Sequence, residues 1–511
     1  MNPDTASMRL RIADNGRYFI NPDGSPFIWI ADTAWTLPQR IMWQDVDYYL
    51  QLRKAQGFTV IQIVALDPER DVEMRDPAGN PALYDVDPAR PNEAYFHYLD
   101  RVIDTAASYG LHVLLLPAWG QLVVGDNWMG QTFDRTLTVD NAYTYGEWIG
   151  RRYRDRDNVI WCMGGDRMPV HKDADYRPVW RALAEGVAHG VTGQRVHWNV
   201  PDPLWQEIPM TYHPCHENET GRCSTMSYWT DDEVWISFIM LQSGHNANIR
   251  SWELVENEYD RASIARRNDT GNAARTMPVW DGEPAYEMMP TSFPEFTDFH
   301  GPWMVRRRAY WSLFAGAFGF TYGHCSVWSS IGERERDPMF QQTWFEALHS
   351  PGADQMQHMH ALIEDLRLMT FQPCQELITG NTEDLTTHVQ ACVSPDGATT
   401  CTYLPSGGDV AIDLAVLTGI SARSGVHSDA DVVNTIVYWW FNPRNGMLIA
   451  DESHTIDGNG TLHTSSPDSG PEHDWILLTT ADGTRPPIAT HSYGDRPSRP
   501  STVTKVFDWG A

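Results

Sequence analysis

The sequence contains no apolar run long enough to cross a lipid bilayer. Such a span needs roughly 18 uncharged apolar residues, whereas the longest apolar runs here, such as LHVLLLPAW at residues 111–119, have the length of a strand. The opening MNPDTASMRLRIADNGRYF also lacks the apolar segment of a secretory signal behind its first basic residue. We therefore expect a cytoplasmic protein without a membrane partner.

Cysteine and basic residues are both scarce. Seven cysteines lie between Cys162 and Cys401 without a CxxC pair, which favours free thiols over a disulfide framework or a cysteine zinc site. Lys and Arg number 38 against 67 Asp and Glu, which gives a formal net charge of −29. A surface of this sign repels phosphate backbones, so we expect no nucleic-acid partner.

Several motifs of cofactor and metal chemistry are missing as well. No GxGxxG follows a predicted strand, and neither a GxSxG elbow nor a Walker loop occurs, so dinucleotide, serine-hydrolase and phosphoryl-transfer chemistry lack support. No HxxxH or HExxH spacing places two metal ligands on one helical face, although several potential ligands occur: His213, Cys215, His216, His245 and His324. We expect neither a metal nor a cofactor.

Apolar and aromatic residues are abundant by contrast. Hydrophobic residues make up 42% of the chain, with 22 Trp, 20 Tyr and 17 Phe, which is enough for a sizeable core in a globular protein. We expect most of the rings in that core. Flat rings also stack on the apolar faces of sugars, so a small carbohydrate becomes a candidate partner.

Short β-branched runs alternate with longer helical patterns from residue 27 to about residue 370, which is typical of βα units around a parallel sheet. The fifth run is ambiguous between residues 195–200 and 208–214, and we favour the second because its polar end resembles the others. Eight strands close a barrel, so we predict an α/β fold with a (β/α)8 TIM barrel and a short N-terminal β lead-in over residues 1–370. The predicted strands are residues 27–35, 58–66, 111–119, 158–166, 208–214, 234–245, 276–283 and 318–324.

Helix signals lie between these strands, and a different pattern follows them. Helices are predicted over residues 45–56, 92–109 and 303–314, with a last helical region over 338–368 that is interrupted near Pro351. After about residue 371, short alternating segments are separated by turn signals such as SPDG at 394–397 and NPRNG at 442–446. We predict a small antiparallel β-sandwich over residues 371–511, with core strands at 436–441 and 474–479. The tail from Arg485 is expected to wrap a surface or fray.

The functional groups of a βα barrel lie at the carboxyl ends of its strands. Asp166 follows strand four and Glu283 follows strand seven, and these strands face each other across an eight-stranded barrel. Such a pair suits glycoside cleavage, in which one group protonates the departing oxygen and the other attacks the anomeric carbon or activates water. In the alternative interpretation, Asp166 caps a helix and Glu283 is an exposed loop acid. Candidate substrate-binding residues at the other strand ends are Asp32, Trp35, Gln62, Trp119, His213, Gln242, His245, Tyr286, Tyr322, His324 and Trp328.

The sequence also resembles a known family, the apiosidase-like glycoside hydrolases, over most of residues 15–330. The resemblance rests on NGRYFINPDGSPFIWIADTAWTL, DYYLQLRKAQGFTVIQIVAL, NVIWCMGGD, TYHP, QSGH and PVWDGEPAYE. It implies that Asp166 of the GGD motif is the acid/base and that Glu283 of the GEP motif is the nucleophile. The second domain is similar, in YLPSG, WWFNPRNG and DWIL, to the module that usually follows in this family. That module carries a collagen-binding label, but we expect it here to buttress the barrel.

We therefore expect a retaining, exo-acting glycoside hydrolase that removes a terminal β-linked apiose or similar pentosyl unit from a plant-derived glycoside. The sequence leaves open another small β-glycoside as substrate, a carbohydrate-binding protein that has lost catalysis, an adhesion role for the second domain, and a homo-oligomer.

Three finer expectations concern the site. Gly165 stands where many related barrels place an Asn that contacts the sugar 2-hydroxyl, so Gln242 or His213 would make that contact. The loops over residues 120–135 and 216–235 are expected to shape the pocket. Glu287 is expected to orient Tyr286 or an arginine such as Arg306.

Overall fold

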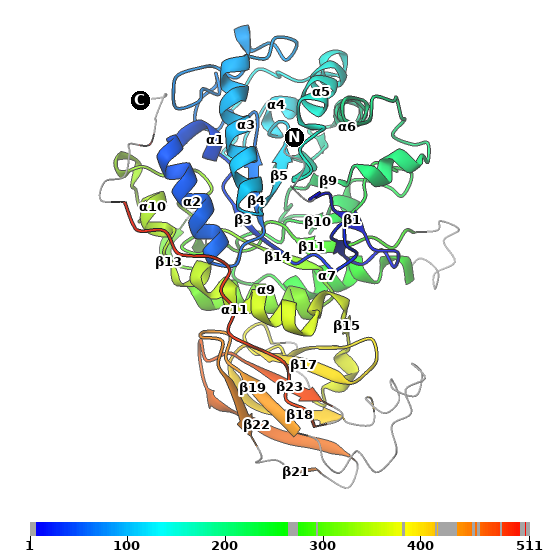
Figure 1. The fold of residues 1–511 in the computed structure, drawn as a ribbon, viewed down its shortest axis with the longest axis vertical. Coiled ribbons are helices and arrows are strands. Elements are labelled where there is room, and N and C mark those ends of the chain that lie inside the picture. The colour runs from blue at the N-terminus through cyan, green and yellow to red at the C-terminus, as the bar shows by residue number, and fades with distance from the viewer. Residues whose placement is uncertain are drawn as a thin grey trace.

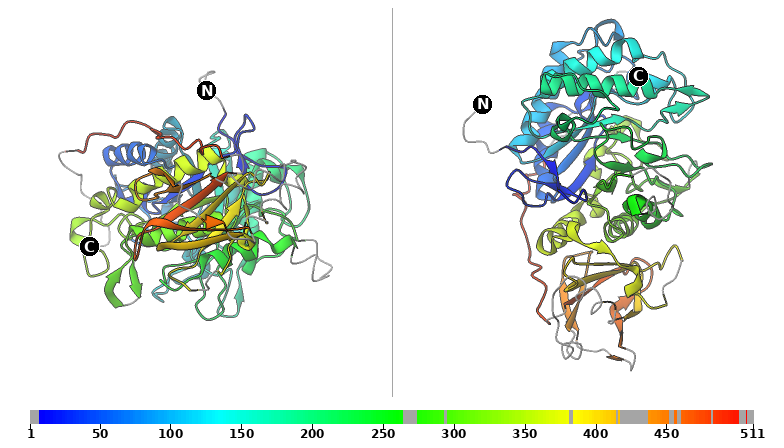
Figure 2. Two further views of the ribbon diagram at one scale, coloured as in Figure 1. Left: turned by 90° about the horizontal axis from the view of Figure 1, so that it is seen from below. Right: turned by 90° about the vertical axis from the view of Figure 1, so that its right-hand side faces the viewer.

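The computed structural model describes residues 7–263, 274–292, 295–380, 384–413, 416, 437–451, 455–456, 460–480, 483–500 and 506. The chain forms a barrel of strands and helices, followed by a smaller domain of antiparallel sheets (Figure 1). The views in Figures 1 and 2 place the smaller domain against one side of the barrel, next to helices α9 (Pro302–Phe314) and α11 (Pro351–Leu366).

Eight parallel strands form the barrel sheet, in the order β10-β11-β14-β3-β4-β5-β6-β9. The predicted fold is confirmed, and the fifth strand lies within residues 208–214, whereas residues 195–200 contain no strand. Ser237, just before β10, donates its backbone N–H to the carbonyl of Met210 in β9 at 2.8 Å, which closes the barrel. The strands are β3 Trp29–Thr33, β4 Val60–Val64, β5 His112–Leu116, β6 Val159–Gly164, β9 Met210–His213, β10 Ile239–Leu241, β11 Val279–Asp281 and β14 Gly319–Tyr322.

Side chains along each barrel strand alternate between the barrel interior and the surrounding helices. In β6, Ile160 and Cys162 belong to the interior cluster, whereas Trp161 and Met163 pack in the layer between strands and helices. Large rings fill the interior near the start of the strands, and the predicted β lead-in contributes one of them. This lead-in is the antiparallel pair β1 (Arg11–Ile12) and β2 (Phe19–Ile20), whose Phe19 ring lies 5.1 Å from the Phe238 ring.

The predicted helices surround this sheet. The side chain of Asn92 accepts a hydrogen bond from the backbone N–H of Ala94 and so caps α3 (Glu93–Ser108), whose apolar stripe from Phe96 to Ala106 is buried. The last helical region is interrupted as predicted, because α11 begins at Pro351. No helix in the described ranges combines the length and apolarity of a membrane span. The other barrel helices are α1 Leu37–Arg40, α2 Trp43–Ala55, α3 Glu93–Ser108, α4 Gln121–Val124, α5 Val139–Tyr153, α6 Arg177–Thr192, α7 Ser251–Tyr259 and α10 Trp344–Ala347.

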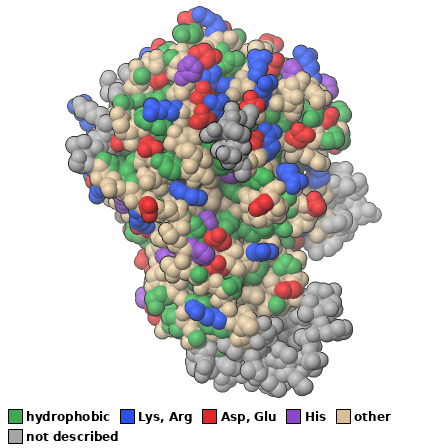
Figure 3. All heavy atoms as spheres, in the orientation of Figure 1, with side chains coloured by type: hydrophobic (Ala, Val, Ile, Leu, Met, Phe, Trp, Pro, Cys, Tyr) green, Lys and Arg blue, Asp and Glu red, His purple; other side chains and the backbone are tan. Residues whose placement is uncertain are grey.

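Basic side chains on the face shown in Figure 3 lie among acidic ones. Arg152 and Arg156 of α5, for example, form ion pairs with Asp100 and Asp104 of α3 at 2.8 and 2.6 Å. These two arginines therefore join helix α5 to helix α3.

The second domain contains two antiparallel sheets, of six and three strands in its described part. The predicted core strands are β19 and β23, which pair with each other and bury Trp440 and Leu477 in the domain core. The larger sheet is β15 Gln372–Pro373, β16 Gln390–Val393, β17 Thr399–Leu404, β23 Trp475–Thr480, β19 Val437–Phe441 and β20 Leu448–Asp451, and the smaller is β18 Gly407–Asp413, β22 Thr461–Ser469 and β21 Thr455–Ile456.

A buried ion pair joins this domain to the barrel. Arg306 of α9 donates two hydrogen bonds, of 2.9 and 2.7 Å, to the carboxylate of Asp474 beside β23. Both side chains are almost completely buried, and the Tyr403 hydroxyl of β17 also donates to Asp474. This contact fixes β23 of the second domain to helix α9 of the barrel.

The described part of the C-terminal tail wraps the barrel. Arg496 pairs with Asp354 of α11 at 2.9 Å, and the Tyr493 ring lies 3.9 Å from the ring of His360 on the same helix. His491 contacts Asp365 at 2.9 Å near the end of that helix. Figure 1 shows the tail, in red, running from the second domain past α11 towards α10.

Candidate active site

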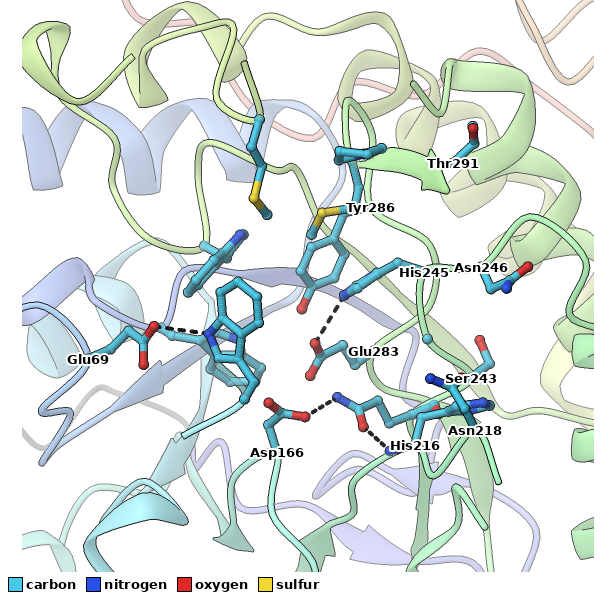
Figure 4. Close-up of a pocket in the computed structure, with 18 of the residues that line it drawn as sticks. Glu69, Asp166, His216, Asn218, Ser243, His245, Asn246, Glu283, Tyr286 and Thr291 are labelled. Carbon is cyan, nitrogen blue, oxygen red and sulfur yellow. Dashed lines mark hydrogen bonds and ion pairs between the residues drawn. The ribbon is translucent and has the colours of Figure 1, made fainter. Parts of the chain in front are cut away.

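A cavity of about 320 Å³ opens at the carboxyl ends of the barrel strands (Figure 4). Asp166 and Glu283 both line it, so the structure brings the two predicted carboxylates together. The alternative interpretation fails for each of them, because the N-cap of the next helix, α6, is Tyr176 and because Glu283 is only 6% exposed.

Glu283 reaches the cavity through a tight turn after β11. The backbone N–H groups of Gly282 and Glu283 both donate to the carbonyl of Leu241 in β10, at 2.8 and 3.2 Å. A side chain at Gly282 would meet the buried Met240 side chain at 2.4 Å, so any larger residue would force Met240 to move.

Two histidines hold the Glu283 carboxylate. His213 Nε2 lies 2.8 Å from one oxygen and His245 Nε2 lies 3.4 Å from the other. Burial alone would raise the pKa of Glu283, but the contacts with His213 and His245 outweigh burial and hold its pKa well below the usual range. In turn, burial lowers the pKa of His213, yet the contact with Glu283 outweighs it and leaves that pKa raised. The two histidines therefore favour the ionised form of Glu283.

Asp166 follows two glycines in left-handed conformations. Gly164 and Gly165 have φ of +85° and +134°, and a side chain at Gly165 would meet the Trp119 ring at 2.6 Å. Asp166 itself has a φ of +46°, which is strained for a residue with a side chain. The GGD motif therefore bends the chain sharply after β6 and aims the carboxyl group into the cavity.

Both oxygens of Asp166 have partners. Gln242 Nε2 donates to Oδ1 at 2.8 Å, and Arg167 Nη1 lies 3.2 Å from Oδ2. The other amide atom of Gln242 accepts a hydrogen bond from the backbone N–H of His216. Gln242 is thus a fixed donor that orients Asp166, and it also lines the cavity.

Six of the predicted substrate-binding residues line the cavity, and five do not. His213 lies behind Glu283 and is fully buried. Asp32 pairs with Arg53 at 2.7 Å, Gln62 donates to the carbonyl of Gly282, and Tyr322 donates to Glu287, so these residues support the barrel around the cavity. His324 is also fully buried and accepts from the backbone N–H of Ser326. The six that line the cavity are Trp35, Trp119, Gln242, His245, Tyr286 and Trp328.

The role that we expected for Glu287 was wrong. Its carboxylate accepts hydrogen bonds from the Tyr322 hydroxyl at 2.7 Å and from the backbone N–H of Gly352 at 3.1 Å. It therefore ties β14 to the first turn of α11 and orients neither Tyr286 nor Arg306.

Sequence reasoning missed several residues of the cavity wall. Most of them lie on the loops that follow the barrel strands, where no periodic pattern marks side-chain direction, and Pro290 and Thr291 lie in the short strand β12 (Pro290–Ser292). The two loops predicted to shape the pocket do contribute, through Trp128 and through His216 and Asn218. The two acidic residues of ALDPE, Asp67 and Glu69, could have been predicted as cavity residues, because they closely follow the buried strand β4. The missed residues are Asp67, Glu69, Trp128, His216, Asn218, Ser243, Gly244, Asn246, Met289, Pro290, Thr291 and Met339.

Within the described ranges, no three His, Cys, Asp or Glu side chains are grouped as a metal site requires. The cavity holds the carboxyl groups of Asp166 and Glu283, with those of Asp67 and Glu69 farther along its wall, among aromatic rings and amides. A (β/α)8 barrel that holds such a pair over its carboxyl face has the site of a glycoside hydrolase.

Comparisons with known proteins give the family. The family model "Apiosidase-like, catalytic domain" matches residues 13–370, and "Putative collagen-binding domain of a collagenase" matches residues 372–480. Because the first match spans more than half of the chain, the protein belongs to the apiosidase-like family and is a glycoside hydrolase of that barrel type.

Solved structures share the fold over almost the whole chain. A glycoside hydrolase with 24% sequence identity has a TM-score of 0.73, and the match covers 93% of this chain and 98% of the other. A family 5 glycoside hydrolase from Bacteroides vulgatus ATCC 8482, also 24% identical, has a TM-score of 0.73 over 98% of this chain and 96% of the other. A comparison with curated protein sequences finds no match.

Proposed function

We propose that the protein is a retaining, exo-acting glycoside hydrolase that removes a terminal β-linked apiose, or a similar pentosyl unit, from a plant-derived glycoside. The observation that carries this proposal is that two histidines contact the carboxylate of Glu283 in the same cavity as Asp166. A carboxylate whose ionised form is favoured suits nucleophilic attack, and a second carboxyl group in the same cavity suits proton transfer.

The proposed reaction has two steps. Glu283 attacks the anomeric carbon while Asp166 gives its proton to the departing oxygen, which leaves a glycosyl ester on Glu283. Asp166 then takes a proton from water, and that water breaks the ester and releases the sugar with its original anomeric configuration. The Nε2 atoms of His213 and His245 face the carboxylate of Glu283, so N–H groups there compensate its changing charge.

The size and lining of the cavity support a small terminal sugar. A volume of about 320 Å³ is near the lower end for ligand pockets, which favours a single small ring over a long polymer segment. Trp35, Trp119 and Trp328 offer aromatic faces for that ring. The family assignment supports apiose as the first sugar to test.

A screen of aryl β-glycosides and apiose-containing glycosides, read by released monosaccharide, tests the proposal. We expect release of apiose or another pentose, and proton NMR of the first product formed should show the β anomer. Release of the α anomer would contradict the retaining mechanism, and cleavage inside oligosaccharides would contradict exo action. Glu283→Ala should abolish turnover, and azide should restore part of it by forming an α-glycosyl azide.

A further inference from the structure

One loop of the cavity wall is held by side chains that the proposed mechanism does not use. This loop, residues 245–249, follows β10 and carries His245, whose Nε2 lies 3.4 Å from Glu283 Oε1 (Figure 4). Residues 245–249 form neither a helix nor a strand, so no regular backbone pairing fixes their course. The contact between His245 and the proposed nucleophile therefore depends on what else holds this loop.

Four of the five carbonyl groups of the loop accept hydrogen bonds from side chains of helix α9 and of the segment just before it. We call these three donors, His300, Arg307 and Arg308, the loop clamp. The contacts are His300 Nε2 with the carbonyl of His245 at 2.6 Å, Arg308 Nη2 with that of Asn246 at 2.5 Å, Arg307 Nη2 with that of Ala247 at 3.3 Å and Arg308 Nη1 with that of Ile249 at 2.5 Å.

Arg308 is a charged residue in a fully buried position. Both groups to which it donates are neutral carbonyls of the loop. Burial, together with the charge of Arg307, lowers the pKa of Arg308 to about 9, and the charge of Asp281 offsets only part of this effect. An apolar side chain would fill this space without the cost of burying a charge. The two contacts with the loop give a reason for a cation at this position.

His300 contacts the same loop without a charge. Burial lowers its pKa to about 4, so the ring is neutral at neutral pH. Because a carbonyl oxygen can only accept, Nε2 of His300 carries the proton and donates it to the hydrogen bond. This contact holds the backbone of His245 itself.

Arg307 extends the loop clamp to the second domain. Its Nη1 donates to the carbonyl of Leu385, on the turn before β16, at 3.2 Å, while its Nη2 donates to the carbonyl of Ala247. Arg307 is only 3% exposed, so both contacts lie inside the protein. One side chain therefore touches both the second domain and a loop of the candidate active site.

We infer that the loop clamp positions the active site: it holds His245 against Glu283, and through Arg307 the second domain takes part in this task. The inference rests on the proposed role of Glu283 as the nucleophile. A loop released from the clamp would let His245 move away, so the ionised form of Glu283 would lose one of its two partners. The pKa of Glu283 would then rise.

The pH dependence of kcat/KM on the dinitrophenyl glycoside of the released sugar tests the inference. Arg308→Met removes two of the four contacts, so it should lower kcat/KM about ten- to hundredfold and move the acidic limb up by about half a pH unit or more.

Two milder variants test the other donors. His300→Phe keeps a ring and removes no charge, so it serves even where Arg308→Met fails to fold, and it should move the limb in the same direction. Arg307→Met should do so as well. An unmoved limb in any of the three variants would overturn the positioning role of that residue, and in Arg307→Met it would overturn the part of the second domain.

A double-mutant cycle separates positioning from a general loosening of the fold. In a His245→Phe background Glu283 has already lost this partner, so adding Arg308→Met should move the limb little further. Equal shifts in both backgrounds would overturn the inference.

Arg181→Met is the matched control. It removes an arginine from α6 and leaves the buried Glu233 without it, so it should lower stability and leave the limb at its wild-type pH. A limb that moves as far in Arg181→Met as in Arg308→Met would show general loosening and overturn the inference. Failure of the wild-type protein to cleave any glycoside in the wider screen would instead refute the proposed function.

Discussion

Replacing Asp166 by Asn separates the proton-donor role of this residue from its structural contacts. Asn has the same shape and can still accept the hydrogen bond from Gln242, but its amide group would face Arg167 in place of a carboxylate oxygen. Losing a hydrogen bond to a charged group costs about 1.5 kcal/mol, so all substrates should lose roughly tenfold in kcat/KM.

The lost proton adds a second effect that depends on the leaving group. General acid catalysis contributes about 10²- to 10⁴-fold, which a good leaving group such as 2,4-dinitrophenolate does not need. We therefore expect Asp166→Asn to lose about tenfold on the dinitrophenyl glycoside and about 10³- to 10⁵-fold on an alkyl glycoside of the same sugar. The assay is kcat/KM, because it reports the steps up to bond cleavage.

A matched control removes the arginine contact and keeps the acid. Arg167→Lys should lower kcat/KM by a similar factor for the two substrates. Equal losses on both substrates in Asp166→Asn would refute the acid role of Asp166.

Two further predictions follow from buried charges. His213→Phe removes one of the two partners of Glu283, so the pKa of Glu283 should rise and the acidic limb of kcat/KM should move up by about one pH unit or more; an unmoved limb would contradict the role of His213. Because the pKa of Glu283 is lowered on folding and that of His213 is raised, this pair stabilises the fold most between the ordinary pKa values of the two free groups, 4.5 and 6.5. The Tm difference between wild type and His213→Phe should shrink both below and well above that window. Arg306→Met leaves Asp474 buried without its main partner and should cost about 3–5 kcal/mol of unfolding free energy, part of which the double variant Arg306→Met/Asp474→Leu should restore. A single variant as stable as wild type in urea unfolding would show that the ion pair does not hold the two domains together.

The barrel could be predicted from the sequence because its strands are buried on both faces and therefore appear as apolar runs. The fifth strand was harder, since both candidate segments are short and mixed, and only the second pairs with β6. The paired carboxylates were predictable for a related reason, because barrel topology fixes which strand ends meet.

The rest of the site could not be predicted, because it depends on which way the strand-end side chains point and on how the loops fold. Successive side chains of a barrel strand point alternately to the interior and to the helix layer. Asp32 therefore points outward like Ile30, and Tyr322 points outward like Phe320. This parity explains why Asp32 meets Arg53 of α2 and not the cavity. Glu69 and Trp128, in contrast, depend on loop conformations that no sequence period determines.

The most direct test of the account is to trap the covalent intermediate. A 2-deoxy-2-fluoro glycosyl fluoride of the released sugar should inactivate the enzyme, and peptide mass spectrometry should find the fluorosugar on Glu283. A label on Asp166, Asp67 or Glu287, or rapid turnover of a product with inverted configuration and no label, would contradict the assignment of Glu283 as the nucleophile.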